Sequence, residues 1–359
     1  MPQEWKPRAR RLRQSGQVGL RKHMQLGQAH MRGGRNDEAL AEFQAVLQER
    51  PDTAVAHLAI GIIEFRKQGY QSAVEHFQNA LALNSELAPA LMMMGNVHMQ
   101  EGDVERALAE FEQAMDLHPS LAGAHMGAGR IHAQQQRFEE AERCLREALR
   151  SNPQMVAARL LLAKMYQDQY NAPAAIEELR QTVNIKPDLW VAHFQLGRLL
   201  FQEKDYMGAV QSFKETIRLN PGMLAALFPL TKIYLDQGKY LEARQLLQDL
   251  LRKKPDSGLI HRLLASVYFQ QQHYPEAISE YQAALLHSPK LAKEHPELLD
   301  IAVDPTKAAD AKSVAKAYHD EFTRIWEGSD EERKAELGDK LRWLARGKAR
   351  MGGIGADGV

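Results

Sequence analysis

The chain has 359 residues and carries 46 lysine and arginine side chains against 46 aspartate and glutamate side chains, so its formal net charge is zero. This balance argues against bulk nucleic-acid binding, which needs a basic surface. The single cysteine, Cys144, excludes an intrachain disulfide framework and a metal site built from several cysteines. The chain has neither an apolar run of the length of a membrane-spanning helix nor an apolar segment after its basic N-terminus, so the sequence predicts a cytoplasmic protein.

The first segment, residues 1–19, is a basic lead. It contains one acid, Glu4, against five basic residues: Lys6, Arg8, Arg10, Arg11 and Arg13. Two interpretations are open. The lead contacts an acidic partner, an anionic membrane surface or nucleic acid, or it is a solvated, partly disordered end that serves as a short polar cap.

Residues 20–291 form eight rows of 34 residues without insertion or deletion. Row position 20 is always alanine: Ala39, Ala73, Ala107, Ala141, Ala175, Ala209, Ala243 and Ala277. Position 8 is always small: Gly27, Gly61, Gly95, Gly129, Ala163, Gly197, Thr231 and Ala265. Position 32 is proline in every row except the second, which has Ser85. An internal period of 34 residues is the signature of a helix-turn-helix solenoid.

Each row reads as two helices. In the third row, apolar residues recur at helical spacing first at Leu91, Met94 and Val97, and then from Leu108 onward. A polar or glycine-bearing break separates the two stretches, and the proline at position 32 ends the second helix. Small residues at positions 8 and 20 are expected to let the paired helices approach closely, while bulky residues at position 24 fill the space against the next row.

The rows resemble the tetratricopeptide repeat family. The family pattern falls on eight residues of the third row: Leu91, Met94, Gly95, His98, Ala107, Phe111, Ala114 and Pro119. The resemblance implies an all-α fold, a right-handed superhelical solenoid of eight 34-residue repeats with C-terminal capping helices. It also implies that the first helices line a concave face. Because the family serves many unrelated complexes, the resemblance predicts a protein-binding scaffold without naming its partner.

After the repeats, residues 292–346 are predicted to form a C-terminal helical cap, and residues 347–359 a flexible tail. The cap should contain one helix over about residues 306–327, which covers the exposed face of the eighth row, and a second over about 330–346. Ser329 and Glu332 have capping-box spacing at the start of the second helix. Trp326 and Trp343 either complete this seal or anchor a partner. The glycines of the tail match the spacing G-x-G-x-x-G, but no strand precedes them and no helix follows.

The sequence predicts neither an enzyme nor a bound cofactor. It has no H-E-x-x-H, phosphate-loop or C-x-x-C motif. Most of the histidines fall at two row positions, position 4 and position 11: His23, His57, His125, His193 and His261, then His30, His98 and His132. Because ligand-spaced Cys, Asp or Glu are missing beside them, we interpret them as partly buried rings between helices and predict no metal site. Several such rings would charge together at low pH and loosen the stack.

If the first helices line a concave face, positions 5 and 12 form an apolar floor and position 9 carries a basic column over four rows. The predicted partner-binding residues are Met92, Asn96, Met126, Arg130, Lys164, Phe194, Arg198, Phe201, Phe228 and Lys232. An apolar strip beside cations suits an amphipathic or acidic protein segment. The alternative is that Asp168 and Asp236, four residues after Lys164 and Lys232, simply pair with these lysines.

These observations predict a non-enzymatic adaptor or assembly factor, bacterial in style, that binds partner segments in its concave groove. One alternative is a self-assembling structural protein, because row one lacks an obvious leading cap helix and open stacks join end to end. Another is a repeat subunit of a membrane-associated multiprotein machine, with peripheral membrane contact through the basic lead.

Overall fold

The computed structural model describes the backbone of residues 5–295, 298–299 and 311–328, and side chains from residue 19 to residue 325 within these ranges. Every regular element among them is helical. The chain divides into two compact units, with the boundary between Met165 and Tyr166. The all-α helical-repeat architecture predicted from the period of 34 is confirmed.

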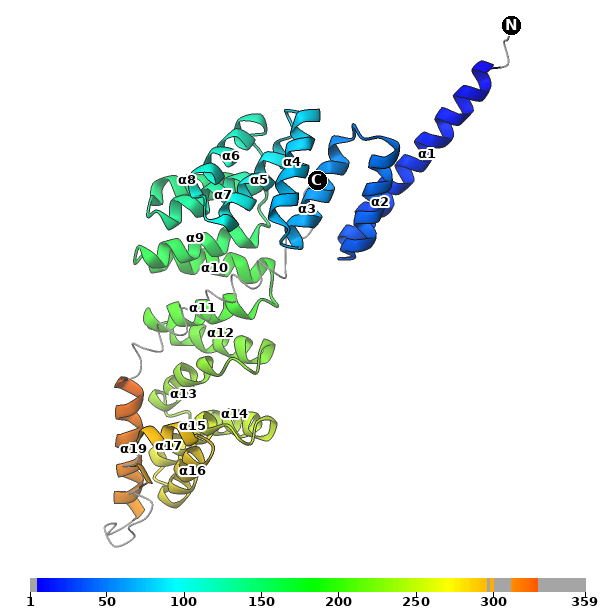
Figure 1. Ribbon diagram of the computed structural model, residues 1–359. Helices are drawn as coiled ribbons and strands as arrows, with labels where there is room; N and C mark the ends of the chain where they lie inside the picture. Colours follow the sequence, from blue (N-terminus) through cyan, green and yellow to red (C-terminus); the bar gives the residue numbers. More distant parts are fainter. Residues whose placement is uncertain (1–4, 296–297, 300–310, 329–359) are drawn as a thin grey trace. The chain divides into compact units, whose positions relative to one another are not determined.

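The first unit is a series of paired antiparallel helices (Figure 1). They are α1 (Trp5–Arg32), α2 (Asn36–Glu49), α3 (Ala54–Arg66), α4 (Tyr70–Leu83), α5 (Ala88–Glu101), α6 (Val104–Leu117), α7 (Ala122–Gln134) and α8 (Phe138–Ser151). The next helix, α9 (Val156–Asp168), spans the boundary between the units. The second helices begin at intervals of exactly one row, at Asn36, Tyr70, Val104 and Phe138.

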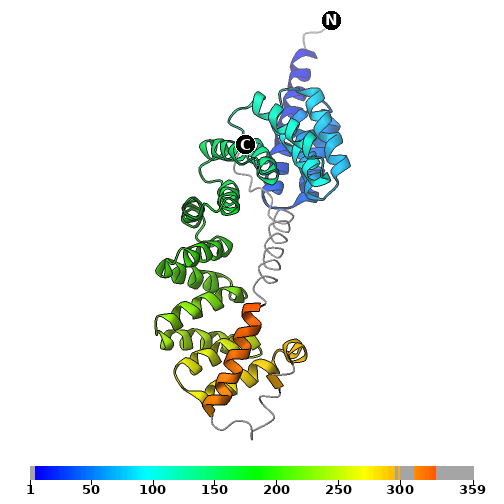
Figure 2. The ribbon, with the colours of Figure 1, turned by 90° about the vertical axis from the view of Figure 1, so that its left-hand side faces the viewer.

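The second unit continues the same pattern (Figure 2). Its helices are α10 (Ala172–Ile185), α11 (Trp190–Gln202), α12 (Tyr206–Leu219), η1 (Leu224–Ala226), α13 (Leu227–Asp236), α14 (Tyr240–Lys253), α15 (Gly258–Gln270), α16 (Tyr274–Leu286), α17 (Pro289–Glu294) and α19 (Ala311–Gly328). In the seventh row, the short 3₁₀ turn η1 precedes α13, so the first helix of that row starts with a tighter turn.

In each unit, some first helices of successive rows contact one another directly. Helix α5 touches both α3 and α7 in the first unit, and α13 touches α15 in the second. The second helices α4, α6 and α8 make no comparable contacts with one another. Because a stack curves toward the side on which its helices lie closer, the first helices form the concave side of each unit.

Within a row, the side chain at position 24 lies closely over the small residue at position 8. A Cβ atom added to Gly61 would come within 2.5 Å of the Phe77 ring, and one added to Gly95 within 2.8 Å of Phe111. The ring of Phe111 also lies over Gly127 of the next row, where a Cβ would approach to 2.5 Å. The alanines at position 20 are all completely buried. The small residues therefore mark the places where a bulky side chain packs directly against a helix backbone.

We expect Gly61→Ala to destabilise the first unit by about 1–2 kcal/mol, because the overpacking at Phe77 outweighs the helix propensity gained from alanine. The matched control is Gly19→Ala in α1, where the nearest heavy atom to an added Cβ is 4.0 Å away. That variant should gain up to about 1 kcal/mol. Urea denaturation of both variants measures the difference, and equal effects would contradict this account.

The turn between the helices of each row contains one residue with left-handed backbone geometry. These residues recur every 34 positions: Gly34, Gln68, Gly102, Gln136, Tyr170, Lys204, Gly238 and Gln272, with φ between 57° and 86°. A side chain strains this conformation by roughly 1–2 kcal/mol, whereas glycine adopts it freely. The turn geometry is therefore common to all rows, and only three of them have the residue that suits it best.

Replacing the exposed Gln136 by glycine should stabilise the protein by up to about 1 kcal/mol, since relief of strain exceeds the entropic cost of glycine. Gln134, the exposed last residue of α7, is the control. Gln134→Gly should destabilise by about 0.5–1 kcal/mol. Thermal unfolding of the two variants should therefore shift the melting temperature in opposite directions.

At the N-terminal end, helix α1 runs from Trp5 to Arg32, so residues 5–19 of the basic lead are helical and continuous with the first row. Pro7 is compatible with this helix because it lies in the first turn, whose N–H groups have no partner within the helix. Several predicted features lie outside the described residues. These are residues 1–4, the second C-terminal helix over 330–346 with Trp343, the tail over 347–359 and the side chain of Trp326.

Helix α19 closes the eighth row. It packs against α16 and α15, which is where the first helix of a further row would pack. His319 stacks on Phe269 with ring centroids 4.3 Å apart, and a hydrogen bond of 2.7 Å joins the Tyr281 hydroxyl and His319 Nδ1. The Phe322 ring stacks on the Tyr281 ring, with centroids 5.1 Å apart. The described part of this helix begins at Ala311, and its outer face is exposed and polar.

Candidate functional site

In the first unit, the predicted groove residues lie on the concave helices. Met92 and Asn96 belong to α5, and Met126 and Arg130 to α7; all four are partly buried. Helices α5 and α7 contact each other, so these four residues lie on adjoining surfaces. The sulfur of Met92 lies 2.5 Å from where a Cβ of Gly123 would be, so this methionine rests against the start of α7. Lys164 is exposed on α9.

Arg130 has the most unusual environment of the groove residues. Burial lowers the pKa of its guanidinium group, and its Nε atom is buried without a hydrogen-bond partner among the described residues. The neighbouring Asn96 donates only to the Met93 sulfur, over 3.7 Å, which is a weak contact. A buried cation without an acceptor is costly, and a carboxylate brought to it would reduce that cost.

In the second unit, Phe201 and Phe228 are partly buried at the concave side. The Phe201 ring packs edge-on against Tyr206 at 6.0 Å, and the guanidinium of Arg262 lies over the Phe228 ring at 6.0 Å. Arg198 is partly buried and interacts with neighbouring groups.

Phe194 is 1% exposed, so the prediction that it lines an accessible surface is wrong. Its ring packs against the Phe213 ring, with centroids 6.2 Å apart. Phe213 itself lies over Gly197, where an added Cβ would meet it at 2.9 Å. In this row, the side chain at position 5 is therefore part of the core, and Phe194 contributes to stability rather than to a binding surface.

The two lysines of the basic column are not paired as the alternative interpretation expected. Lys164 and Lys232 are exposed. In the part of the chain that the structure describes, neither forms an ion pair with the aspartate four residues later, Asp168 or Asp236. Both cations are therefore available to a partner.

The histidines at position 4 join consecutive rows. Nε2 donates to the carbonyl oxygen of the proline six residues earlier, over 2.7 Å in His125–Pro119, 3.0 Å in His193–Pro187 and 2.9 Å in His261–Pro255. A carbonyl oxygen only accepts, so these nitrogens carry the hydrogen. Sequence reasoning missed this bond, although the regular six-residue spacing from position 32 to position 4 of the next row could have revealed it.

Histidines at position 4 also contact the side chain at position 23 of their own row. His23 Nδ1 lies 2.5 Å from Glu42 Oε2, and His261 Nδ1 lies 2.6 Å from Glu280 Oε2. In the second row the partner is another histidine, with 3.1 Å between Nδ1 of His57 and Nδ1 of His76. Among the described residues, no three His, Cys, Asp or Glu side chains gather in a way that could hold a metal ion.

The close pair of imidazoles makes the second row sensitive to pH. Burial, and secondly the neighbouring His57, lower the pKa of His76 below its ordinary value of 6.5. The unfolded chain then binds this proton more readily than the folded one. The stability that depends on neutral His76 is thus complete above about pH 6.5 and falls as the pH drops through the folded pKa.

We expect His76→Gln to lose less stability than the wild type between pH 7.5 and pH 5.0, since glutamine can donate to His57 and does not titrate. His118→Gln, at an exposed histidine of the same unit, is the control and should retain the wild-type response. Chemical denaturation at both pH values gives the comparison. Identical pH dependence in the His76 variant and the wild type would refute the assignment.

Fold and surface together define a helical-repeat protein whose concave helices carry accessible apolar and cationic side chains. Two models of the family described as "Tetratricopeptide repeat" match the chain, one over residues 98–154 and 200–267 and the other over 24–89 and 132–189. Together these segments cover more than half of the sequence. The chain belongs to the tetratricopeptide repeat family, whose members are generally protein-interaction modules.

Solved structures show the same fold. Pseudomonas aeruginosa PilF is 19% identical, with a TM-score of 0.52 over 62% of this chain and 99% of that one. PilW, described as a type IV pilus biogenesis factor, is 19% identical, with a TM-score of 0.51 over 60% of this chain and 97% of that one. YrrB, a tetratricopeptide repeat protein with an unusual peptide-binding site, is 24% identical, with a TM-score of 0.44 over 52% of this chain and 96% of that one. Identities this low establish the fold alone.

No curated protein matches the sequence significantly. None of the helices in the described part of the chain is both long and apolar enough to cross a lipid bilayer.

Proposed function

We propose that the protein is a non-enzymatic adaptor or assembly factor whose concave helices bind acidic, amphipathic segments of partner proteins. In the first unit the contacting residues are Met92, Asn96, Met126, Arg130 and Lys164. In the second unit they are Arg198, Phe201, Phe228 and Lys232. Each unit presents its own surface, and Phe194 belongs to neither.

The environment of Arg130 carries the proposal. Its side chain is partly buried, burial lowers the pKa of its guanidinium group, and Nε has no acceptor in the described structure. Folding alone gains nothing from such a cation, since hydrophobic residues of similar size would pack there at lower cost. A partner carboxylate would supply the missing acceptor, and a charge-assisted bond in a partly dry site is strong.

The apolar side chains around Arg130 suit a partner helix or extended segment. Met92 and Met126 are partly exposed, and methionine adapts its shape to different apolar surfaces. The exposed lysines at position 9, Lys164 and Lys232, favour acidic sequences and speed their encounter. Recognition would therefore combine apolar contacts at the floor of the groove with ion pairs between carboxylates of the partner and the cations at position 9.

The experiment is selection of binding peptides from a random 12-residue display library, with the full-length protein as the target. Selected peptides should be enriched in Asp and Glu next to apolar residues. Selection on Arg130→Glu should lose the acidic enrichment, and acidic peptides found with the wild type should bind this variant at least about tenfold more weakly.

Arg106→Glu is the matched control, because Arg106 lies in the same unit on the second helix α6 and its side chain is 74% exposed. Peptides that bind this variant as they bind the wild type, and fail on Arg130→Glu, support the concave site. If the Arg130 variant keeps full affinity while its circular dichroism is unchanged, the proposal is wrong.

The finer parts of the sequence-based hypothesis stay predictions. These are the cytoplasmic location, the bacterial origin, self-assembly, and membrane docking through the basic lead. The side chains of residues 5–18, on which membrane docking depends, lie outside the described ones.

A further inference from the structure

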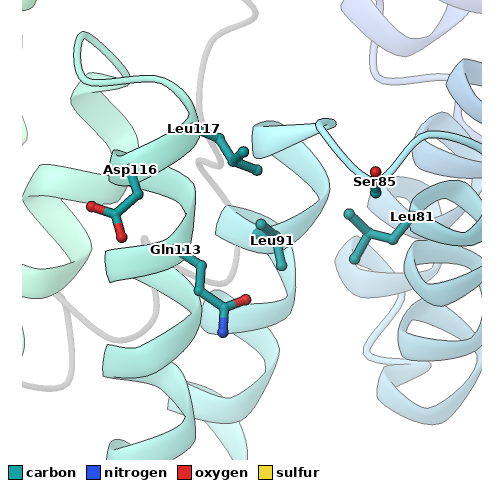
Figure 3. A pocket seen from close by; sticks show the side chains of 6 residues that line it. All are labelled: Leu81, Ser85, Leu91, Gln113, Asp116 and Leu117. Atoms are coloured by element: carbon teal, nitrogen blue, oxygen red, sulfur yellow. The ribbon is translucent and has the colours of Figure 1, made fainter.

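An open hollow of about 420 Å³ lies on the first unit (Figure 3). It is lined by Leu81, Ser85, Leu91, Gln113, Asp116 and Leu117. Its charged residue, Asp116, is exposed, so the chemistry of the lining favours no particular ligand. Glu110, whose Oε2 atom is buried without a hydrogen-bond partner among the described residues, lies outside this lining. The second unit holds a more specific arrangement, because titratable side chains meet inside the contact between α19 and the eighth row.

His319 of α19 joins the terminal helix to both helices of the last row. Its ring stacks on Phe269 of α15, with centroids 4.3 Å apart and an interplanar angle of 12°. Its Nδ1 atom lies 2.7 Å from the Tyr281 hydroxyl of α16, and that hydroxyl lies 3.4 Å from Ser266 Oγ of α15. A change in the charge of this one ring therefore acts on the whole contact.

The hydrogen bond between Tyr281 and His319 suits a neutral imidazole. Burial raises the pKa of Tyr281 well above its usual value, so the hydroxyl keeps its hydrogen and can donate it to an unprotonated Nδ1. A protonated ring carries a hydrogen on Nδ1, so the tyrosine would have to accept it and direct its own hydrogen toward Ser266 Oγ. The distance of 3.4 Å to that oxygen is long for an O–H···O bond. Protonation would thus leave the tyrosine hydrogen without a good acceptor.

The charges around His319 also favour its neutral form. Burial lowers the pKa of His319 below its ordinary value of 6.5; the adjacent Asp320 opposes this shift, and Arg262 of α15 adds to it. Asp320 is exposed, so water and salt screen its attraction. Arg262 is only 8% exposed, and its repulsion acts through the less polarisable protein interior.

We propose that His319 makes α19 an acid-sensitive cap, which is docked on the eighth row at neutral pH and leaves it more often as the pH falls. In the released helix His319 meets water and binds a proton more readily than in the docked helix. The docking free energy that depends on neutral His319 is therefore complete above about pH 6.5, and it is lost as the pH falls through the lowered pKa. Tyr318 and Phe322, buried in the same contact, do not titrate in this range, so acid changes how often α19 opens while the rows stay folded.

Hydrogen–deuterium exchange of the full-length protein, measured by mass spectrometry at pH 7.5 and pH 5.0, tests this proposal. Exchange times are scaled so that the intrinsic chemical rate is the same at both pH values. Peptides from α19 should lose protection at pH 5.0 by a factor at least about threefold larger than peptides from α11, which lies two rows away in the same unit. Equal changes in α19 and α11 would overturn the proposal.

Three variants separate His319 from the other titrating groups of the unit. His319→Gln can still accept from Tyr281 and does not titrate, so its α19 should show the same protection at both pH values. Arg262→Met removes the buried like charge and keeps an apolar stem, so it should reduce the loss seen at pH 5.0. His273→Gln, at an exposed histidine of the same row, is the control and should respond as the wild type does. A wild-type loss in His319→Gln, or an unaltered loss in Arg262→Met, would show that His319 does not control the cap.

Discussion

The packing of a bulky side chain at position 24 over a small residue at position 8 is the constraint on which the repeat structure depends. It sets how closely the two helices of a row approach, as at Gly61 and Phe77, where no atom can be added between them. Where the ring also reaches the next row, as Phe111 does at Gly127, the same contact sets the spacing between rows. The concave face then follows, because the first helices are the ones that this packing brings together.

On this regular frame, the functional candidates are the places where a row lacks what its neighbours have. Arg130 is a cation without an acceptor, and Glu110 is a carboxyl group without a donor. In a repeat protein such gaps are easy to recognise, since the other rows show how the same position is normally satisfied.

Much of the fold could be predicted from the sequence, because the period of 34 fixes the helix pairs and the buried alanines. The candidate groove could be predicted only in part. Periodicity assigns a side chain to a face, and it placed Met126 and Arg130 correctly on a concave helix. It could not show that Phe194 turns inward to meet Phe213, since that depends on the space above Gly197.

Helix α19 gives the chain an end that does not obey the repeat. It packs against α15 and α16, where the first helix of a ninth row would pack. Its aromatic contacts are with Phe269 and Tyr281, which both belong to the last row. The array can therefore change its length during evolution by whole units of 34 residues without a new terminator, provided that the final row keeps those two rings.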